Sequence, residues 1–178
     1  MNTHDFLRNF APVAFMGLSL AASAQSGKLV DRRDQAEGWY LPLHGIVLAE
    51  GQKAEGVKVV LYKNNELVGE LPVDKKGHFI AELDIDNTFA LVITKDGFQM
   101  ELLHVDTTLP EGRVEYPEYE CTINMERATA FAGKDEGFYL DFPAAIVRWS
   151  DDMKGFYHSE AYHMDIKGRL AGYAQASF

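Results

Sequence analysis

From residue 43 to residue 125 the chain repeats one pattern, a short run of alternating apolar and polar residues followed by a turn signal. Alternation with a period of two places every second side chain on the same face of a β-strand. The pattern predicts strands at 43–49, 57–63, 66–73, 78–83, 89–95, 98–105 and 119–125. Seven short strands at this spacing predict an all-β fold, a seven-stranded antiparallel β-sandwich with one shared core.

Turn residues separate these runs. Asn64-Asn65 lies between the second and third runs, where asparagine tolerates a positive φ, and Gly77 and Gly97 follow aspartates at later turns. The residues expected to face the core therefore recur at every second position. They are Val57, Val59, Leu61, Phe79, Ala81, Leu83, Phe89, Leu91 and Ile93.

The N-terminal segment has the order of a secretory signal peptide. A polar stretch with Arg8 precedes an apolar run at 10–22, and small residues at Ala22 and Ala24 precede Gln25. The apolar run is shorter than the roughly 20 residues that span a bilayer. We therefore expect a cleaved signal peptide at 1–24, a flexible linker at 25–38 and a periplasmic or extracellular location.

Charge and cysteine content narrow the possible partners. The formal net charge is −10, and nucleic acid requires a basic face, so we expect no nucleic-acid partner. The one cysteine, Cys121, has no second cysteine with which to form an intramolecular disulfide. No second long apolar run follows residue 24, so we expect no transmembrane segment in the mature chain.

The region 127–178 differs from the strand block because it is richer in aromatic residues. We expect a strand at 145–149 and a helix capped by Ser159 that runs to about residue 170. This C-terminal extension should lie against the sandwich, with the helix over an exposed face or edge. Its aromatic residues suggest a possible ligand face, made of Trp149, Phe156, Tyr157 and Tyr162.

The block 44–98 carries a recognisable set of residues: Gly45, Val47, the run 56–59, Asp74, Gly77, Phe79 and the run 91–98. In this set the sequence resembles the carboxypeptidase regulatory-like domain, a transthyretin-like sandwich abundant in envelope proteins of Bacteroidetes. The resemblance implies a sandwich domain at 39–126. It also implies an accessory function, because the namesake domain assists a metallopeptidase and is not the peptidase itself.

Two clusters of polar residues contain side chains that could bind a metal ion. Glu160 and His163 share one face of a predicted helix, although no second such pair follows, so solvent-facing polar residues are the favoured interpretation. Asp84, Asp86 and Asn87 could contact calcium, but a plain turn suits their spacing better. We expect no metal or other cofactor.

Familiar catalytic motifs, such as a nucleophile elbow, a zinc peptidase motif or a phosphate loop, do not occur in the sequence. The sequence therefore predicts a non-catalytic envelope protein that binds another protein or a glycan. The alternative is a hydrolase with an unfamiliar site in the C-terminal extension, using Glu160, His163 and Asp151.

Overall fold

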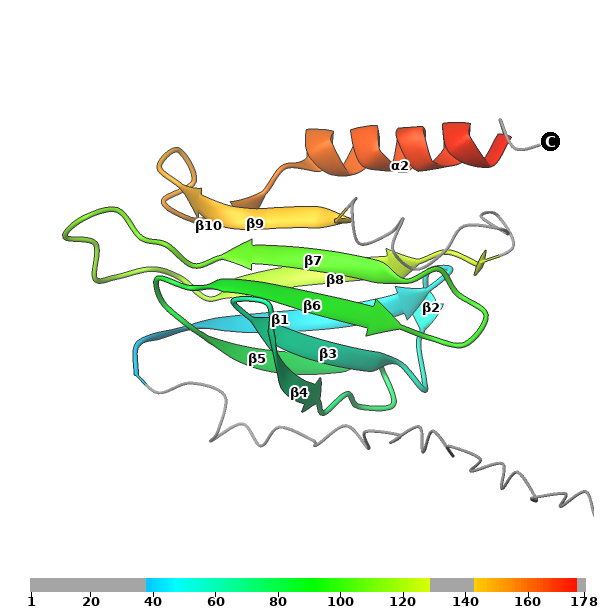
Figure 1. Ribbon diagram of the computed structural model, residues 1–178, viewed down its shortest axis with the longest axis horizontal. Coiled ribbons are helices and arrows are strands. Elements are labelled where there is room, and N and C mark those ends of the chain that lie inside the picture. The colour runs from blue at the N-terminus through cyan, green and yellow to red at the C-terminus, as the bar shows by residue number, and fades with distance from the viewer. Residues whose placement is uncertain (1–37, 129–142, 176–178) are drawn as a thin grey trace, which may run out of the picture.

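The computed structural model describes residues 38–128 and 143–175, and side chains as far as Arg169 (Figure 1). The predicted signal peptide, and the linker as far as residue 37, lie outside the described residues. The described elements are β1 (Tyr40–Ala49), β2 (Gln52–Lys53), β3 (Lys58–Lys63), β4 (Glu66–Leu71), β5 (His78–Asp84), β6 (Thr88–Thr94), β7 (Glu101–Asp106), β8 (Tyr119–Met125), β9 (Ala145–Ser150), β10 (Gly155–His158) and α2 (Glu160–Gln175).

The strands form two sheets around one apolar core. The larger sheet has six strands in the order β10-β9-β7-β6-β3-β4. In the smaller sheet β1 lies between β5 and β8, and the short β2 pairs with the end of β1. The predicted all-β class is therefore confirmed, with two sheets and one short helix.

Strand direction differs from the prediction. Each of the seven predicted strands is found, but β2, β9 and β10 join them, and two pairs are parallel. β8 runs parallel to β1, with Cys121 opposite Gly45, and β9 runs parallel to β7. The expectation of a seven-stranded antiparallel sheet pair was wrong because residues 107–118 carry the chain from one sheet to the other. A crossing connection can deliver a strand in either direction, whereas a tight hairpin gives only an antiparallel pair.

The sixth predicted strand also begins later than expected, at Glu101 instead of residue 98. Phe98 instead forms an isolated bridge with Arg127, and the backbone N–H of Gln99 donates to the backbone carbonyl of Glu126 at 2.8 Å. The segment that follows the turn therefore pairs first with the chain beyond β8, and only then enters the larger sheet.

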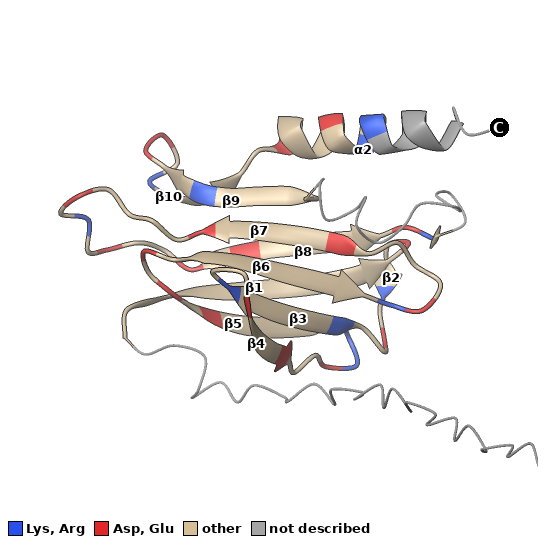
Figure 2. Ribbon diagram, viewed as in Figure 1, with Lys and Arg blue, Asp and Glu red and all other residues tan. Residues whose placement is uncertain are grey.

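The core follows the predicted alternation. All nine residues expected to face inward are buried, and Val59, Leu61, Ala81, Leu83, Leu91 and Ile93 have no exposed surface. Charged side chains lie mostly in loops and at strand ends (Figure 2). Apolar burial between the two sheets is thus the main stabilising term of the fold.

Two glycines are needed for this packing. A Cβ on Gly45 would lie 2.1 Å from the Phe79 ring, so only glycine lets that ring lie across β1. Gly77 has a φ of +87°, and its Cβ would lie 2.2 Å from the backbone oxygen of Val47. Asn64 and Asn65 adopt positive φ angles of 49° and 67°, as the turn prediction required.

The C-terminal region completes the larger sheet. β9 pairs with β7, β10 pairs with β9, and Val147 and Phe156 belong to the main core. The Ser159 hydroxyl accepts a hydrogen bond from the Tyr162 amide at 3.3 Å, so Ser159 caps α2 as predicted. The helix runs on to Gln175, past the predicted end near residue 170.

The helix lies along β8. His158, just before its start, contacts Tyr119 at the start of β8, and Lys167 pairs with Glu126 just past the end of that strand. β8 has β1 on one side in its sheet and no other described strand on the other side. None of the helices in the described part of the chain is long and apolar enough to cross a membrane.

Candidate functional site

Three of the four aromatic residues of the predicted ligand face are divided between the two faces of the β9–β10 hairpin, and the fourth, Tyr162, lies on α2. Trp149 stands opposite Phe156 in the pairing, and Arg148 stands opposite Tyr157. Because side chains alternate along a strand, these two pairs point to opposite faces. Phe156 is only 8% exposed and packs in the core, so it is not part of an exposed ligand face.

A groove runs over the outer face of this hairpin and the start of α2, and we call it the aromatic groove. Tyr157 and Tyr162 line it from the hairpin and the helix, and the exposed Arg148 stands opposite Tyr157 on β9. Its volume is about 550 Å³. The full lining is Ile146, Arg148, Trp149, Ser150, Tyr157, Ser159 and Tyr162.

Four contacts hold the aromatic residues of this hairpin. Tyr157 stacks on His158, with ring centroids 5.9 Å apart and planes at 23°. The Trp149 and Phe156 rings meet edge to face, with centroids 5.8 Å apart. The Arg113 guanidinium lies 5.1 Å from the centroid of the Trp149 ring, and Nε1 of Trp149 donates a hydrogen bond to Asp151 at 2.8 Å. These contacts fix the Trp149 ring on the opposite face of the hairpin, so Trp149 only borders the groove, whereas Tyr157 and Tyr162 line it.

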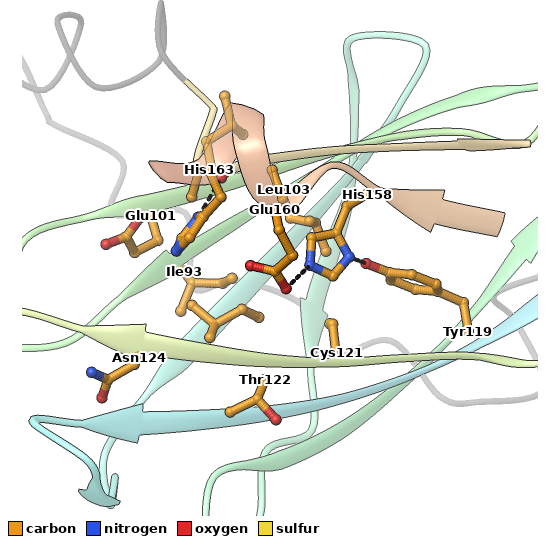
Figure 3. A pocket seen from close by; sticks show the side chains of 14 residues that line it. Ile93, Glu101, Leu103, Tyr119, Cys121, Thr122, Asn124, His158, Glu160 and His163 are labelled. Atoms are coloured by element: carbon orange, nitrogen blue, oxygen red, sulfur yellow. Dashed lines mark hydrogen bonds and ion pairs between the residues drawn. The ribbon is translucent and has the colours of Figure 1, made fainter. Parts of the chain in front are cut away.

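A second cavity, which we call the interior pocket, lies between β7, β8 and the first turn of α2 (Figure 3). Its volume is about 150 Å³. Figure 3 shows His163 and Glu101 on one side and His158, Glu160 and Tyr119 on the other. The lining is Ile93, Glu101, Leu102, Leu103, Tyr119, Cys121, Thr122, Ile123, Asn124, Ala144, Ala145, His158, Glu160 and His163.

A chain of polar contacts forms one wall of the interior pocket. Burial raises the pKa of Tyr119 well above its usual range, so its hydroxyl stays protonated and donates to Nδ1 of His158 at 2.6 Å. The other nitrogen of His158, Nε2, lies 3.6 Å from Oε1 of Glu160. The partners on both sides therefore favour a proton on Nε2 of His158.

His163 has a similarly fixed orientation. Its Nδ1 lies 2.8 Å from the Ala144 carbonyl oxygen, which can only accept a hydrogen bond. Nδ1 must therefore carry a proton, and in the neutral ring Nε2 is left as an acceptor.

Glu101 is an acidic residue in an inward row. Its register partner is Ile93, and the same row of β7 continues with the buried Leu103 and Val105. Burial raises the pKa of Glu101 to about 7, with Lys167 lowering it and Glu126 raising it to smaller extents. The sequence analysis missed this residue, although its alternation with Leu103 and Val105 could have revealed a carboxyl group in a core position.

The residues of the alternative hydrolase do not converge. Glu160 and His163 both line the interior pocket, but Asp151 lies in the β9–β10 turn, where it accepts from Trp149. Burial raises the pKa of Cys121, which lines the same pocket, to about 12, so the reactive thiolate is scarce at neutral pH. The pocket therefore offers neither the predicted set nor an activated thiol.

The acidic cluster at 84–87 lies at the end of β5 and in the turn that follows it. Asp84 pairs with Lys63 at 2.5 Å, and the Asn87 side chain donates to the Ile85 carbonyl at 2.8 Å. This matches the plain turn that the sequence favoured at 84–87. Within residues 38–128 and 143–169, no group of three or more His, Cys, Asp or Glu side chains is arranged to hold a metal ion.

No family model and no curated protein sequence matches this chain. Among solved structures it is similar to 3-chlorocatechol 1,2-dioxygenase from Rhodococcus opacus 1CP, at 13% identity and a TM-score of 0.41, over 56% of this chain and 64% of that one. It is also similar to hydroxyquinol 1,2-dioxygenase from Pseudomonas putida DLL-E4, at 12% identity and a TM-score of 0.38, over 52% of this chain and 58% of that one. Chlorocatechol 1,2-dioxygenase from Pseudomonas putida gives 13% identity and a TM-score of 0.34, over 56% and 63%. The chain spans less than two thirds of each, and TM-scores this low assign neither a fold family nor an activity.

Proposed function

We propose that this chain is a non-catalytic, exported protein of the bacterial envelope that binds another protein or a glycan through the aromatic groove. The observation that carries the proposal is the meeting of Tyr157, Tyr162 and Arg148 on one exposed surface. Tyrosine and arginine are enriched at binding hot spots because each offers a rigid apolar body with a polar end. The hydroxyls of Ser150 and Ser159 border the same surface and add hydrogen-bonding groups.

The proposed location and fold family rest on the sequence. The order of polar, apolar and small residues over 1–24 supports cleavage before Gln25 and release into the periplasm or beyond it. The residues of the block 44–98 support a transthyretin-like sandwich of the carboxypeptidase regulatory-like type. Both features are typical of accessory envelope proteins.

The test is capture of partners on immobilised protein. Envelope extract would be passed over the mature wild-type chain and over the double variant Tyr157→Ala/Tyr162→Ala, and bound material would be analysed for proteins and for saccharides. We expect a saturable partner that is lost with the double variant. Met164→Ala is the matched control, because Met164 is 67% exposed on the same helix but does not line the groove.

Three results would contradict the proposal. They are equal capture by the wild type and the double variant, equal loss with Met164→Ala, and the absence of any saturable partner. A partner that survives protease digestion but not glycosidase treatment would identify a glycan, and the reverse would identify a protein. Location is checked separately by N-terminal sequencing of protein from cell fractions, where a cytoplasmic chain that begins at Met1 would refute export.

A further inference from the structure

The interior pocket has a volume that suits a small organic molecule. A protein cavity of about 150 Å³ holds one benzene-sized ligand. Ile93, Leu103 and Ile123 supply apolar walls, so an aliphatic or ring portion of a ligand would be buried against hydrocarbon. This pocket lies between the sheets and is separate from the aromatic groove on the outer face of the hairpin.

Three polar side chains of the pocket can accept hydrogen bonds. Glu101 and Glu160 contribute carboxylates, and His163 contributes the Nε2 lone pair that its bond to Ala144 leaves available. Within the described part of the chain, no lysine or arginine lines the pocket, and no residue donates a hydrogen bond to the Glu101 carboxylate. The complementary ligand therefore carries positive charge and N–H donors.

Glu101 is the residue whose position most needs a functional explanation. It occupies the inward row of β7 together with buried Leu103 and Val105, where an apolar side chain would stabilise the fold better. The cation that lowers the pKa of Glu101, Lys167, is already paired with Glu126 at 3.4 Å. A carboxyl group that lies between the sheets without a hydrogen-bond donor of its own can bind a cation that enters the pocket.

We propose that the interior pocket binds a small organic ammonium ion of about six heavy atoms. In this arrangement the ammonium group lies between Glu101 and Glu160 and donates to Nε2 of His163, and the hydrocarbon part packs on Ile93 and Leu103. The hydrogen bond between Tyr119 and His158 orients the imidazole, whose Nε2 lies 3.6 Å from Oε1 of Glu160.

The test uses three probes that share a cyclopentyl ring and differ in charge: cyclopentylammonium, cyclopentanol and cyclopentanecarboxylate. Binding to the mature chain is followed by amide chemical shifts in ¹H–¹⁵N spectra. We expect cyclopentylammonium to bind with a Kd of about 1 mM or tighter, which is ordinary for a ligand of this size. The neutral and anionic probes should bind at least about tenfold more weakly, because each lacks the charge that the carboxylates match.

Variants assign the site. Glu101→Gln and Glu160→Gln should each weaken cyclopentylammonium binding by about tenfold or more, since each removes one carboxylate charge. Glu120→Gln is the matched control: it changes net charge equally, but Glu120 is exposed on β8 and does not line the pocket. If Glu101→Gln fails to fold, cyclopentylammonium binding to Glu160→Gln decides instead. The Glu160 side chain is 74% exposed, so its substitution should leave the fold intact.

The proposal is overturned by any of three results. The first is the absence of a saturable shift with cyclopentylammonium up to about 50 mM, a concentration far above the expected Kd. The second is equal affinity for cyclopentanol. The third is equal weakening of cyclopentylammonium binding by Glu120→Gln and Glu101→Gln. Shifts confined to the aromatic groove would also overturn it, because they would place the cation at Tyr157 and Tyr162 instead.

Discussion

The strands before residue 126 and the segment after residue 143 are held in place by different forces. β1, β3, β5 and β6 contribute rows of apolar side chains with almost no exposed surface. Among the described side chains of α2 only Ile166 is buried, and the helix adds polar contacts: His163 to the Ala144 carbonyl, and Lys167 to Glu126. The β9–β10 hairpin is held both by apolar burial and by polar contacts, since Phe156 lies in the core and His158 forms a hydrogen bond with Tyr119.

This difference explains where the candidate sites lie. Close-packed apolar rows stabilise a fold but leave no polar groups for recognition. The interior pocket lies where the C-terminal segment meets the sandwich, because polar side chains from distant parts of the chain gather there. The aromatic groove is lined by residues of the C-terminal segment alone. The predictions below test whether the first region supplies stability and the second supplies specific contacts.

Removal of the C-terminal region should have the largest effect. A chain that ends at Met125 loses buried Val147 and Phe156 and exposes the edge of β7 that pairs with β9. Each buried side chain of this size contributes roughly 1.5–3 kcal/mol, so we expect a loss of at least about 3 kcal/mol together with aggregation. Denaturation curves and size-exclusion chromatography provide the check. A monomeric truncated chain with an unchanged Tm would show that the tail does not cover the sandwich.

Core truncation within the strand block comes next. Leu91→Ala and Phe79→Ala should each reduce the free energy of unfolding by about 2–5 kcal/mol, because both side chains are buried between the sheets. Leu67→Ala is the control for Leu91→Ala, since Leu67 is 52% exposed on β4 and should change stability by less than about 0.5 kcal/mol. Equal denaturation midpoints for Leu67→Ala and Leu91→Ala would mean that the register of β6 is wrong.

The third prediction concerns pH and Glu101. Its pKa in the folded chain, about 7, is above its ordinary value of 4.5, so the fold favours the protonated acid. Stability from this group is fully present below about pH 4.5 and is lost as pH rises through about 7. Glu101→Gln resembles the protonated form at every pH.

The stability of Glu101→Gln relative to wild type should therefore increase between pH 5 and pH 8, by roughly 1–3 kcal/mol, since one pKa unit corresponds to about 1.4 kcal/mol. Urea denaturation across that pH range measures the difference. Glu120→Gln, at an exposed position on β8, should give a flat difference. A flat difference for Glu101→Gln as well would mean that Glu101 is solvated in the folded chain.

The smallest effect is expected from one hydroxyl. Tyr119→Phe removes the donor to Nδ1 of His158, a contact between β8 and β10, and should cost about 1 kcal/mol. Tyr116→Phe is the matched control, because its hydroxyl makes a longer, exposed contact of 3.2 Å with the Tyr40 carbonyl. Thermal denaturation of both variants decides. A larger loss for Tyr116→Phe would contradict the importance assigned to the Tyr119–His158 contact.

The amino-acid sequence by itself determined the strand block, its inward rows and its turns. Alternation at 79, 81 and 83 and the asparagine pair at 64–65 act over a few residues, so the chain encodes them locally. Ser159 likewise specified the start of α2, because a cap needs only a hydroxyl and the first helical turn.

Only the tertiary structure decided how distant segments meet. The parallel pairing of β8 with β1, the burial of Phe156 and the grouping of Glu101, His158 and Glu160 all join residues far apart in the chain. A period of two states that a side chain points inward or outward, but it does not state which strand lies beside it. Long-range packing makes that choice, because it selects the arrangement that buries the most apolar surface while keeping polar groups paired.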